Sequence, residues 1–396
     1  MAARAIPVAL IAALLAFQVV RTAMVRQSPS GTALWPGHPE ILRNQVMAEI
    51  GTIAARGERI PPQLLMQVEQ IARQLPLAPE PFLIHGALAQ IEGREEQAER
   101  LYLEARRRDP RSPAARYFLT ERYLRTGRVE QALGEMAVLS RLTGAVGAFG
   151  PALANYARTP GAVPHLRRFF AMAPEFEPVV LSVLAADAKN LGLIATLWSG
   201  ARVAEPGGQG DWQALIVRKL VEAGDFTRAH AAWRRFSGIA GPVRGIFNPQ
   251  FQRLDAPPPF NWTFGSAGGL AQPTGSGELE LIYFGRDEAV LAQQLLLLAP
   301  GRYVLGMQVG GDVKAGSGIA WSVECVGGQR PLLTLPVERR AAGRAQASFV
   351  VPPGCPAQQL RLSGTPGEFP RAIEFTVGQL QLTRLAAPGA TGAERS

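Results

Sequence analysis

The chain has 396 residues, 47% of them apolar, so it is long enough to bury more than one hydrophobic core and to form several domains. Its formal net charge is +9, but the 41 basic residues include only three lysines, and the arginines are interleaved with glutamates. Because no basic stripe with interleaved aromatic residues is present, the composition argues against a protein that binds nucleic acid.

The N-terminal residues form an apolar segment flanked by arginines. Residues 5–20 lie between Arg4 and Arg21 and have no polar face at helical spacing. Such a segment is typical of an export signal or a membrane anchor. Cleavage after Ala23 would place an arginine where signal peptidases need a small residue, so we interpret residues 1–26 as a retained signal anchor. A cleaved signal peptide is the alternative.

The anchor predicts the location of the rest of the protein. We expect a linker over residues 27–38 and a single-pass protein of the bacterial inner membrane, with its soluble domains in the periplasm. Arginines on both sides of the apolar segment leave its orientation undetermined by charge.

Residues 39–245 are rich in alanine, leucine, arginine and glutamate, with apolar residues at helical spacing and short loops marked by glycine or proline. Small residues recur in this region 34 residues apart, which is the period of a helical repeat array. The pattern resembles the tetratricopeptide repeat (TPR), in which antiparallel helix pairs stack into a solenoid. The residues that define the repeat are Gly86, Gly93, Ala98, Tyr102, Pro110, Tyr123, Gly127, Ala132, Gly224, Ala229 and Trp233.

The resemblance is strongest over the two units Pro79–Ser112 and Pro113–Gly144, where Gly144 replaces the closing proline. A weaker first unit closes with the helix predicted over residues 63–75. The motif returns over residues 212–237, and further helices are predicted over residues 162–173, 179–190 and 193–203.

A solenoid of this kind implies a protein partner, held in a groove that the first helix of each pair lines. We predict that Arg116, Arg122 and Arg125 lie on this face and receive an acidic or extended peptide. The alternative is an ordinary solvated face of charged side chains.

After residue 245 the sequence changes to short runs of alternating apolar and polar residues separated by glycine and proline. Residues 246–385 therefore predict an antiparallel β-sandwich, followed by a flexible tail over residues 386–396. A tight hairpin at Ala299-Pro300-Gly301 is expected between two strands. The predicted strands cover residues 278–284, 290–298, 302–309, 319–326, 346–351, 358–363 and 373–385.

The two cysteines, Cys325 and Cys355, both lie in the predicted sandwich. They form either a disulfide, which an exported protein can oxidise, or two buried thiols. The alternation within residues 319–325 places Trp321 and Cys325 in the core.

The order of features in residues 246–385 resembles a galactose-binding-like jelly roll of the carbohydrate-binding-module type. The matching segments are residues 248–251, 260–262, 293–294, 298–303 and 373–382. The resemblance implies binding of glycans through aromatic rings that stack on sugars. The candidate rings are Trp262, Phe264, Tyr283 and Phe284, for which packing in the core or at an edge is the alternative.

Motifs of the common enzyme classes are absent. The chain has no G-x-S-x-G, G-x-x-x-x-G-K, H-E-x-x-H or C-x-x-C sequence, and its four histidines are scattered, so we expect no catalytic residue, no metal and no cofactor. Only the carboxylate pairs Asp287-Glu288 and Glu278 with Glu280 suggest a glycosidase. Asn261-Trp262-Thr263 is formally a glycosylation sequon.

Together these features favour a non-enzymatic, membrane-anchored cell-envelope scaffold that binds a protein through its repeats and a glycan through its sandwich, in polysaccharide assembly or export. The alternatives are a glycan-active enzyme with a catalytic sandwich, and a cytosolic adaptor in which the leader is a misread helix.

Overall fold

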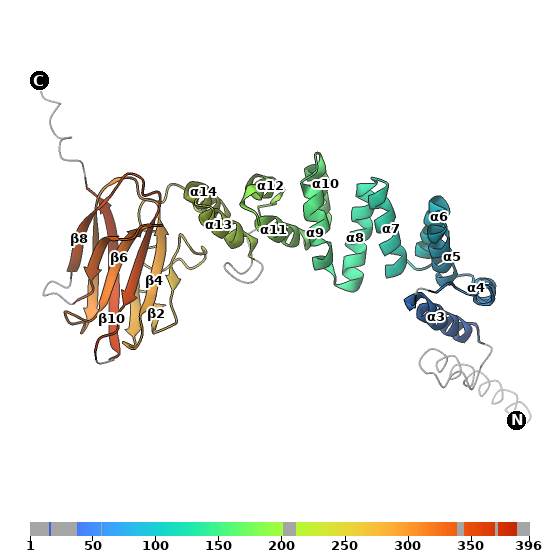
Figure 1. Ribbon diagram of the computed structural model, residues 1–396, viewed down its shortest axis with the longest axis horizontal. Helices are drawn as coiled ribbons and strands as arrows, with labels where there is room; N and C mark the ends of the chain where they lie inside the picture. Colours follow the sequence, from blue (N-terminus) through green and yellow to red (C-terminus); the bar gives the residue numbers. More distant parts are fainter. Residues whose placement is uncertain are drawn as a thin grey trace, which may run out of the picture. The chain divides into compact units, whose positions relative to one another are not determined.

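The computed structural model describes residue 16 and residues 38–56, 58–200, 211–338, 344–368 and 371–385 (Figure 1). The predicted signal anchor, linker and C-terminal tail lie outside the described residues, apart from Ala16 and His38. Among the described helices, none is long and apolar enough to cross a bilayer. Two compact units divide between Phe149 and Gly150.

The first unit consists of paired helices, as predicted. Consecutive helices pack against each other as α3 with α4, α5 with α6 and α7 with α8. The helices are α3 (Pro39–Ala55), α4 (Pro62–Gln74), α5 (Glu80–Ile91), α6 (Glu95–Arg108), α7 (Pro113–Arg125), α8 (Val129–Thr143) and the beginning of α9 (Val146–Ala157).

The turns inside α5–α6 and α7–α8 have the same backbone geometry. Gly93 and Gly127 are left-handed, with φ angles of 75° and 70°. The amide that follows each glycine donates to the carbonyl five residues earlier, from Arg94 to Ala89 at 2.7 Å and from Arg128 to Tyr123 at 2.9 Å. This is the helix-ending geometry for which glycine is preferred, because a side chain at positive φ is strained.

Within α5–α6 a glycine permits close packing of the two helices. A Cβ on Gly86 would lie 2.7 Å from Cε1 of Tyr102, which is 2% exposed. We therefore expect Gly86→Ala to destabilise the first unit by about 1–3 kcal/mol through overpacking. Gly134→Ala, where a Cβ meets nothing within 4 Å, should instead stabilise the unit by about 0.5–1 kcal/mol.

Urea denaturation of the two variants, monitored by helical circular dichroism, tests this difference. Equal stabilities for Gly86→Ala and Gly134→Ala would contradict the close packing against Tyr102.

The second unit begins with helices and ends with strands. Its helices after α9 are α10 (Ala162–Met172), α11 (Phe176–Ala185), α12 (Leu191–Leu197), α13 (Trp212–Glu222) and α14 (Phe226–Phe236), with a short 3-10 helix at Ala188–Asn190. The turn between α13 and α14 repeats the geometry of the first unit. Gly224 has a φ of 75°, and the amide of Asp225 donates to the carbonyl of Leu220 at 2.9 Å.

The strands form two antiparallel sheets that face each other across one core (Figure 1). The first sheet has the order β1-β4-β9-β6-β7, and the second sheet has the order β2-β3-β10-β5-β8. The strands are β1 (Thr263–Phe264), β2 (Gly269–Pro273), β3 (Glu278–Tyr283), β4 (Ala289–Leu296), β5 (Gly301–Gly311), β6 (Ile319–Cys325), β7 (Pro331–Pro336), β8 (Arg344–Val351), β9 (Gln358–Gly364) and β10 (Ile373–Arg384). An α-then-β architecture is therefore confirmed.

The predicted hairpin at residues 299–301 is wrong. The flanking strands β4 and β5 belong to different sheets, so this turn carries the chain from one sheet to the other. Two strands separated by a short proline–glycine turn predict a hairpin from the sequence. In a sandwich, however, the chain must pass from one sheet to the other so that both sheets face the same core, and this turn makes such a passage.

Residues 238–262, here called the connecting segment, join α14 to β1 without regular structure. Side-chain amides replace sheet pairing in this segment. Gln294 of β4 accepts from the amide of Phe247 and donates to its carbonyl, both at 2.9 Å. Trp262 donates through Nε1 to the carbonyl of Asn248 at 2.8 Å. The segment is thus hydrogen-bonded to the sandwich through Gln294 and to itself through Trp262, and these buried polar groups would be costly to leave unpaired.

A disulfide joins Cys325, at the end of β6, to Cys355, in the loop between β8 and β9, with their Cα atoms 5.5 Å apart. Cys355 is buried, whereas Cys325 is only partly buried. Because the bond closes a loop with a sequence separation of 30, we expect its reduction to destabilise the second unit by about 3–4 kcal/mol.

Thermal unfolding with and without a thiol reductant measures this effect. A variant with both cysteines changed to alanine should already be destabilised and should not respond to the reductant. A wild type that unfolds at the same temperature in both conditions would contradict the prediction.

Candidate functional site

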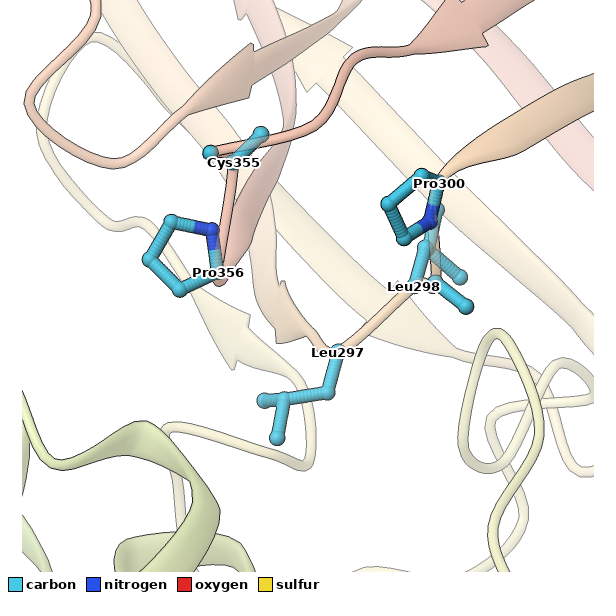
Figure 2. Close-up of a pocket in the computed structure, with 7 residues that line it drawn as sticks. Leu297, Leu298, Pro300, Cys355 and Pro356 are labelled. Atoms are coloured by element: carbon cyan, nitrogen blue, oxygen red, sulfur yellow. The ribbon is translucent and has the colours of Figure 1, made fainter.

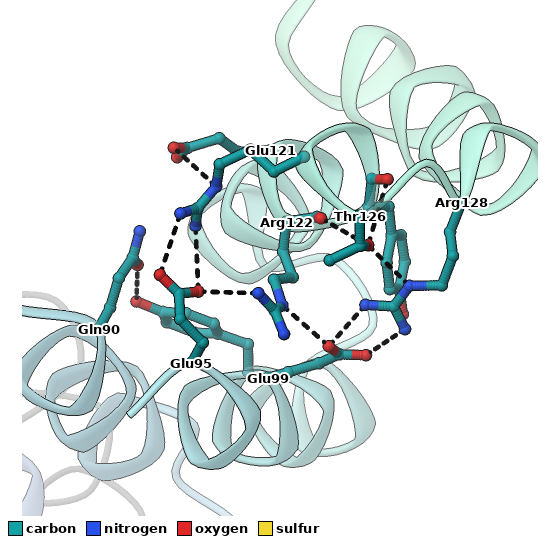
Figure 3. Close-up of polar contacts among 10 residues, drawn as sticks. Gln90, Glu95, Glu99, Glu121, Arg122, Thr126 and Arg128 are labelled. Atoms are coloured by element: carbon teal, nitrogen blue, oxygen red, sulfur yellow. Dashed lines mark hydrogen bonds and ion pairs between the residues drawn. The ribbon is translucent and has the colours of Figure 1, made fainter. Parts of the chain in front are cut away.

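Arg122, one of the arginines predicted to bind a partner, is paired within the first unit (Figure 3). Arg122 of α7 contacts Glu95 and Glu99 of α6, at 3.1 Å in each case. Arg125 contacts Glu95 at 3.0 Å and Glu121 at 3.8 Å. The contacts with Glu95 and Glu99 join the second helix of one pair to the first helix of the next, so the arginines stabilise the stacking of the helix pairs.

Arg116 is also occupied. Its guanidinium donates to the carbonyl of Pro110 and lies 2.5 Å from Glu135 of α8. Glu135 pairs with Arg106 through its other oxygen, and its side chain is 7% exposed. The prediction of a free cationic groove is therefore not supported, because Glu95, Glu99 and Glu135 neutralise it from neighbouring helices. The sequence separation of these pairs hid them from a search at helical spacing.

Glu99 pairs with two arginines of this network, Arg122 and Arg128. Arg128 donates to both of its oxygens at 2.6 Å, and this hydrogen bonding holds the pKa of Glu99 below its ordinary value. Burial works in the opposite direction, and the hydrogen bond from Arg122 adds to the lowering. The carboxylate is thus charged at neutral pH and acts as an ion-pair acceptor rather than as a proton donor.

Exposed apolar side chains lie on the first helices of the pairs instead. Tyr117 and Leu124 of α7 are 58% and 43% exposed, and they follow each other at helical spacing around Glu121. Ile91 of α5 is 82% exposed and lies one 34-residue repeat before Arg125 of α7, whose side chain is 44% exposed. The 34-residue repeat gave no signal for these side chains, because the residues one repeat before Tyr117 and Leu124 are Leu83 and Gln90.

Two of the four rings predicted to stack on sugars are buried. Trp262 and Tyr283 are 4% and 1% exposed in the sandwich core, so neither offers a face to a sugar. Phe264 is partly buried against the same core, and Phe284 is 44% exposed. The prediction that these four rings form a sugar-binding platform is therefore wrong for the two buried rings. A β-rich sequence does not show which aromatic rings fill the core between two sheets, and here most of the four rings pack in or against that core.

The outer side of the second sheet carries a polar surface with small residues at its centre, here called the polar shelf. Gly378 of β10 is opposite Glu278 of β3 and Gln308 of β5. Added Cβ atoms on Gly378 and Gly310 would meet Glu278 at 3.0 Å and Thr376 at 2.3 Å. The shelf comprises Glu278, Glu280, Gly306, Gln308, Gly310, Gln346, Thr376, Gly378 and Gln381.

The predicted carboxylate pairs do not converge in a cleft. Glu278 and Glu280 are exposed on one strand, and Asp287 and Glu288 are exposed in the loop that follows β3. In the described part of the chain, no group of three or more histidine, cysteine, aspartate or glutamate side chains could hold a metal. Asn261 is 2% exposed, and its amide donates to two backbone carbonyls, so it does not offer a glycosylation site.

Each unit has a pocket among its described residues. The pocket of the second unit has a volume of about 550 Å³ and an apolar wall (Figure 2). Leu297, Leu298 and Pro300 come from the turn after β4, and Cys355 and Pro356 come from the loop before β9. Neither a carboxylate nor a histidine is among its lining residues.

The pocket of the first unit has a volume of about 460 Å³ and lies at the beginning of α6. Its charged lining includes Arg94, Glu95 and Arg122, and all three are already paired within the unit.

No family model matches the chain, and no curated protein matches it. Weakly similar solved structures include the following two. The enzymatically active domain of tailspike protein 4 from bacteriophage CBA120 is 12% identical, with a TM-score of 0.25 over 36% of this chain and 22% of that chain. The MamA RS-1 ArsTM double mutant is 16% identical, with a TM-score of 0.23 over 50% of this chain and 93% of that chain. This chain thus spans about a fifth of the tailspike domain, and neither similarity assigns it to a family.

Proposed function

We propose that the protein is a non-enzymatic scaffold of the bacterial cell envelope, with a TPR-like domain that binds a protein and a jelly roll that binds a glycan. The observation that carries the protein-binding part is the exposed apolar face on α5 and α7, formed by Ile91, Tyr117 and Leu124. Exposed apolar residues on the first helices of two consecutive pairs favour a protein partner, because repeat arrays bind along the surface that the repeats share.

The TPR assignment is supported by the recurrence of one turn geometry at Gly93, Gly127 and Gly224. It is also supported by the contact between Gly86 and Tyr102, which brings two antiparallel helices close together. In this proposal the paired arginines hold the stack of helix pairs, and the apolar face binds the partner.

The jelly-roll assignment is supported by the strand orders β3-β10-β5-β8 and β4-β9-β6-β7. In both orders, strands distant in sequence lie next to each other, as in a double Greek key. The polar shelf is the glycan-binding surface in this proposal. Its amides can donate and accept, as sugar hydroxyls require. Gly306, where the nearest atom to an added Cβ is 3.8 Å away, allows a flat polymer to approach the backbone.

The membrane anchor, the periplasmic location and a role in polysaccharide assembly or export are parts of the same proposal. They are supported by the apolar segment at residues 5–20. A reporter enzyme that is active only in the periplasm, fused after Ser237, should be active. Activity of a cytosol-specific reporter at the same position would favour the cytosolic adaptor instead.

Site-specific photo-crosslinking in cells tests the protein-binding face. A photoreactive residue at Tyr117 or Leu124 should give one discrete adduct of higher mass. The matched control is Arg107 of α6, whose side chain is 82% exposed on a second helix of a pair. Adducts of equal yield at Tyr117 and Arg107 would contradict the assignment of the face.

Affinity electrophoresis of the detergent-solubilised full chain in gels that contain a neutral polysaccharide tests the shelf. Gly306→Val adds a branched side chain where the nearest atom to a Cβ is 3.8 Å away, so it blocks the shelf without overpacking. It should abolish retardation, whereas Ser322→Val on the first sheet should not. Shortening of the polysaccharide during the experiment would favour the glycan-active enzyme.

A further inference from the structure

His230 lies where the last helix meets the connecting segment. It belongs to α14 and is half-buried. Its ring stacks on Trp233 with centroids 5.6 Å apart and an interplanar angle of 23°, and it meets the edge of Phe260 at 4.9 Å and 70°. The imidazole is therefore part of the contact that joins the helix to the connecting segment.

The contacts of His230 lead directly to the sandwich. Trp233 is 1% exposed and donates through Nε1 to the carbonyl of Pro257 at 2.8 Å. The ring of Trp233 also meets the ring of Phe247, with centroids 4.9 Å apart. The backbone amide and carbonyl of Phe247 are both hydrogen-bonded to the side chain of Gln294 of β4. A change in the packing of His230 thus acts on a chain of contacts that reaches the first sheet.

No described carboxylate pairs with the His230 ring, and within the described residues no oxygen accepts a hydrogen bond from it. Arg234, one turn further along α14, is a like charge. The other charged groups on elements packed here pair among themselves. They are Arg218, Lys219 and Glu222 on α13, Asp225 and Arg228 on α14, and Arg253 and Asp255 in the connecting segment. Two further cations lie on these elements: Arg235 of α14, which donates to the carbonyl of Ala195, and Arg244 of the connecting segment.

This environment favours the neutral imidazole. Burial, followed by the charge of Arg234, lowers the pKa of His230 below its ordinary value of 6.5. Attraction of an imidazolium to the face of Trp233 works in the opposite direction, but a separation of 5.6 Å is near the outer limit for that interaction.

The sign of the resulting pH dependence follows from linkage. When the contact opens, His230 regains its ordinary affinity for protons, so the open state binds more protons than the closed state below the ordinary pKa of 6.5. The stability of the contact is fully present above that pH and falls as the pH decreases towards the lowered pKa of the closed state.

We propose that His230 makes the contact between α14 and the connecting segment a pH-sensitive joint, which is closed at neutral pH and loosens on acidification. This joint lies entirely within the second unit and does not depend on the proposed partner or glycan. Loosening would separate the last helix pair from the sandwich while leaving both sheets intact.

Hydrogen exchange of the full chain in detergent, at about pH 7.5 and about pH 5 and corrected for the intrinsic rates, tests the joint. Peptides from residues 238–262 should lose protection at the lower pH, whereas peptides from β6 and β9 should not. His230→Gln should abolish this difference. Arg234→Gln should reduce it, because removal of the like charge brings the closed-state pKa nearer to the ordinary value.

His85→Gln in the first unit is the matched control and should leave the response of residues 238–262 unchanged. Equal protection of these residues at the two pH values in the wild type would overturn the proposal, as would an undiminished loss in His230→Gln. If His230→Gln does not fold, the Arg234→Gln comparison decides, and an unchanged response in that variant overturns the proposal.

Discussion

Replacement of Trp233 by alanine should destabilise the second unit by about 3–5 kcal/mol, the cost of removing a large aromatic side chain from a close-packed site. The ring is 1% exposed and packs against Phe247 and Phe260 of the connecting segment. The truncation would leave a cavity and would remove the donor to the carbonyl of Pro257. Because the ring occupies the boundary between α14 and the sandwich, both should lose stability together.

Trp233→Phe separates the two contributions. It keeps most of the ring contacts and loses the hydrogen bond, so we expect a cost of about 1–3 kcal/mol. Leu254→Ala in the same segment, where the side chain is 60% exposed, should change stability by about 0.5 kcal/mol or less. Urea denaturation, monitored by hydrogen exchange of peptides from each unit, distinguishes unfolding of the second unit from unfolding of the first. Similar costs for Trp233→Ala and Leu254→Ala would show that the boundary is not packed as described.

Replacement of Glu135 by alanine should destabilise the first unit by about 3 kcal/mol, because it leaves two arginines near each other without a counter-charge. The carboxylate is almost completely buried, and Arg116 is 12% exposed, so solvent cannot fully replace the lost pairing. Arg106 is 34% exposed and can turn towards water, which keeps the expected cost at the lower end of the range for buried pairs.

The matched control for Glu135 is Glu121→Ala. Glu121 and Arg125 are 47% and 44% exposed and lie one helical turn apart, so their pair should contribute about 0.5 kcal/mol or less. Thermal and urea denaturation of both variants measure the difference. If the two substitutions cost the same, the burial of Glu135 between α6, α7 and α8 does not determine the stability of the stack.

Helices and strands with a periodic apolar pattern were predicted correctly from the sequence. The helices over residues 63–75 and 162–173 appear as α4 and α10, and the strand over residues 358–363 appears as β9. These segments have regular apolar spacing and are bounded by proline or glycine, so local preferences and tertiary packing agree.

Elements with weak local signals were missed. Helix α9 contains Gly147, Gly150 and Pro151, which individually disfavour a helix. A Cβ on Gly150 would lie 2.8 Å from Val179 of α11, so close packing between helices explains this glycine. Strand β7 begins and ends with proline, which is tolerated because β7 is at the edge of its sheet.

Pairing between distant residues explains the incorrect part of the site prediction. Arg122 and Glu99 are 23 residues apart, and Trp262 meets Trp321 in the core with ring centroids separated by 5.8 Å. A sequence shows that such residues are charged or aromatic, but it does not show which of them neutralise or cover one another. The arginines and rings therefore looked available for ligands until their partners were known.

The sequence by itself determined the α-then-β order, the 34-residue helical repeat with its glycine turns, and the alternation that places Trp321 in the sandwich core. Each of these is set by local backbone preference and by apolar periodicity, which a linear pattern records. Only the tertiary structure decided the crossing between sheets at residues 299–301, the neutralisation of Arg116 and Arg122, and the burial of His230 at the joint. These three features depend on which residues, distant in the sequence, come into contact on folding. Folding buries apolar surface and also requires each buried charge to find a partner, and a linear pattern does not record those partners.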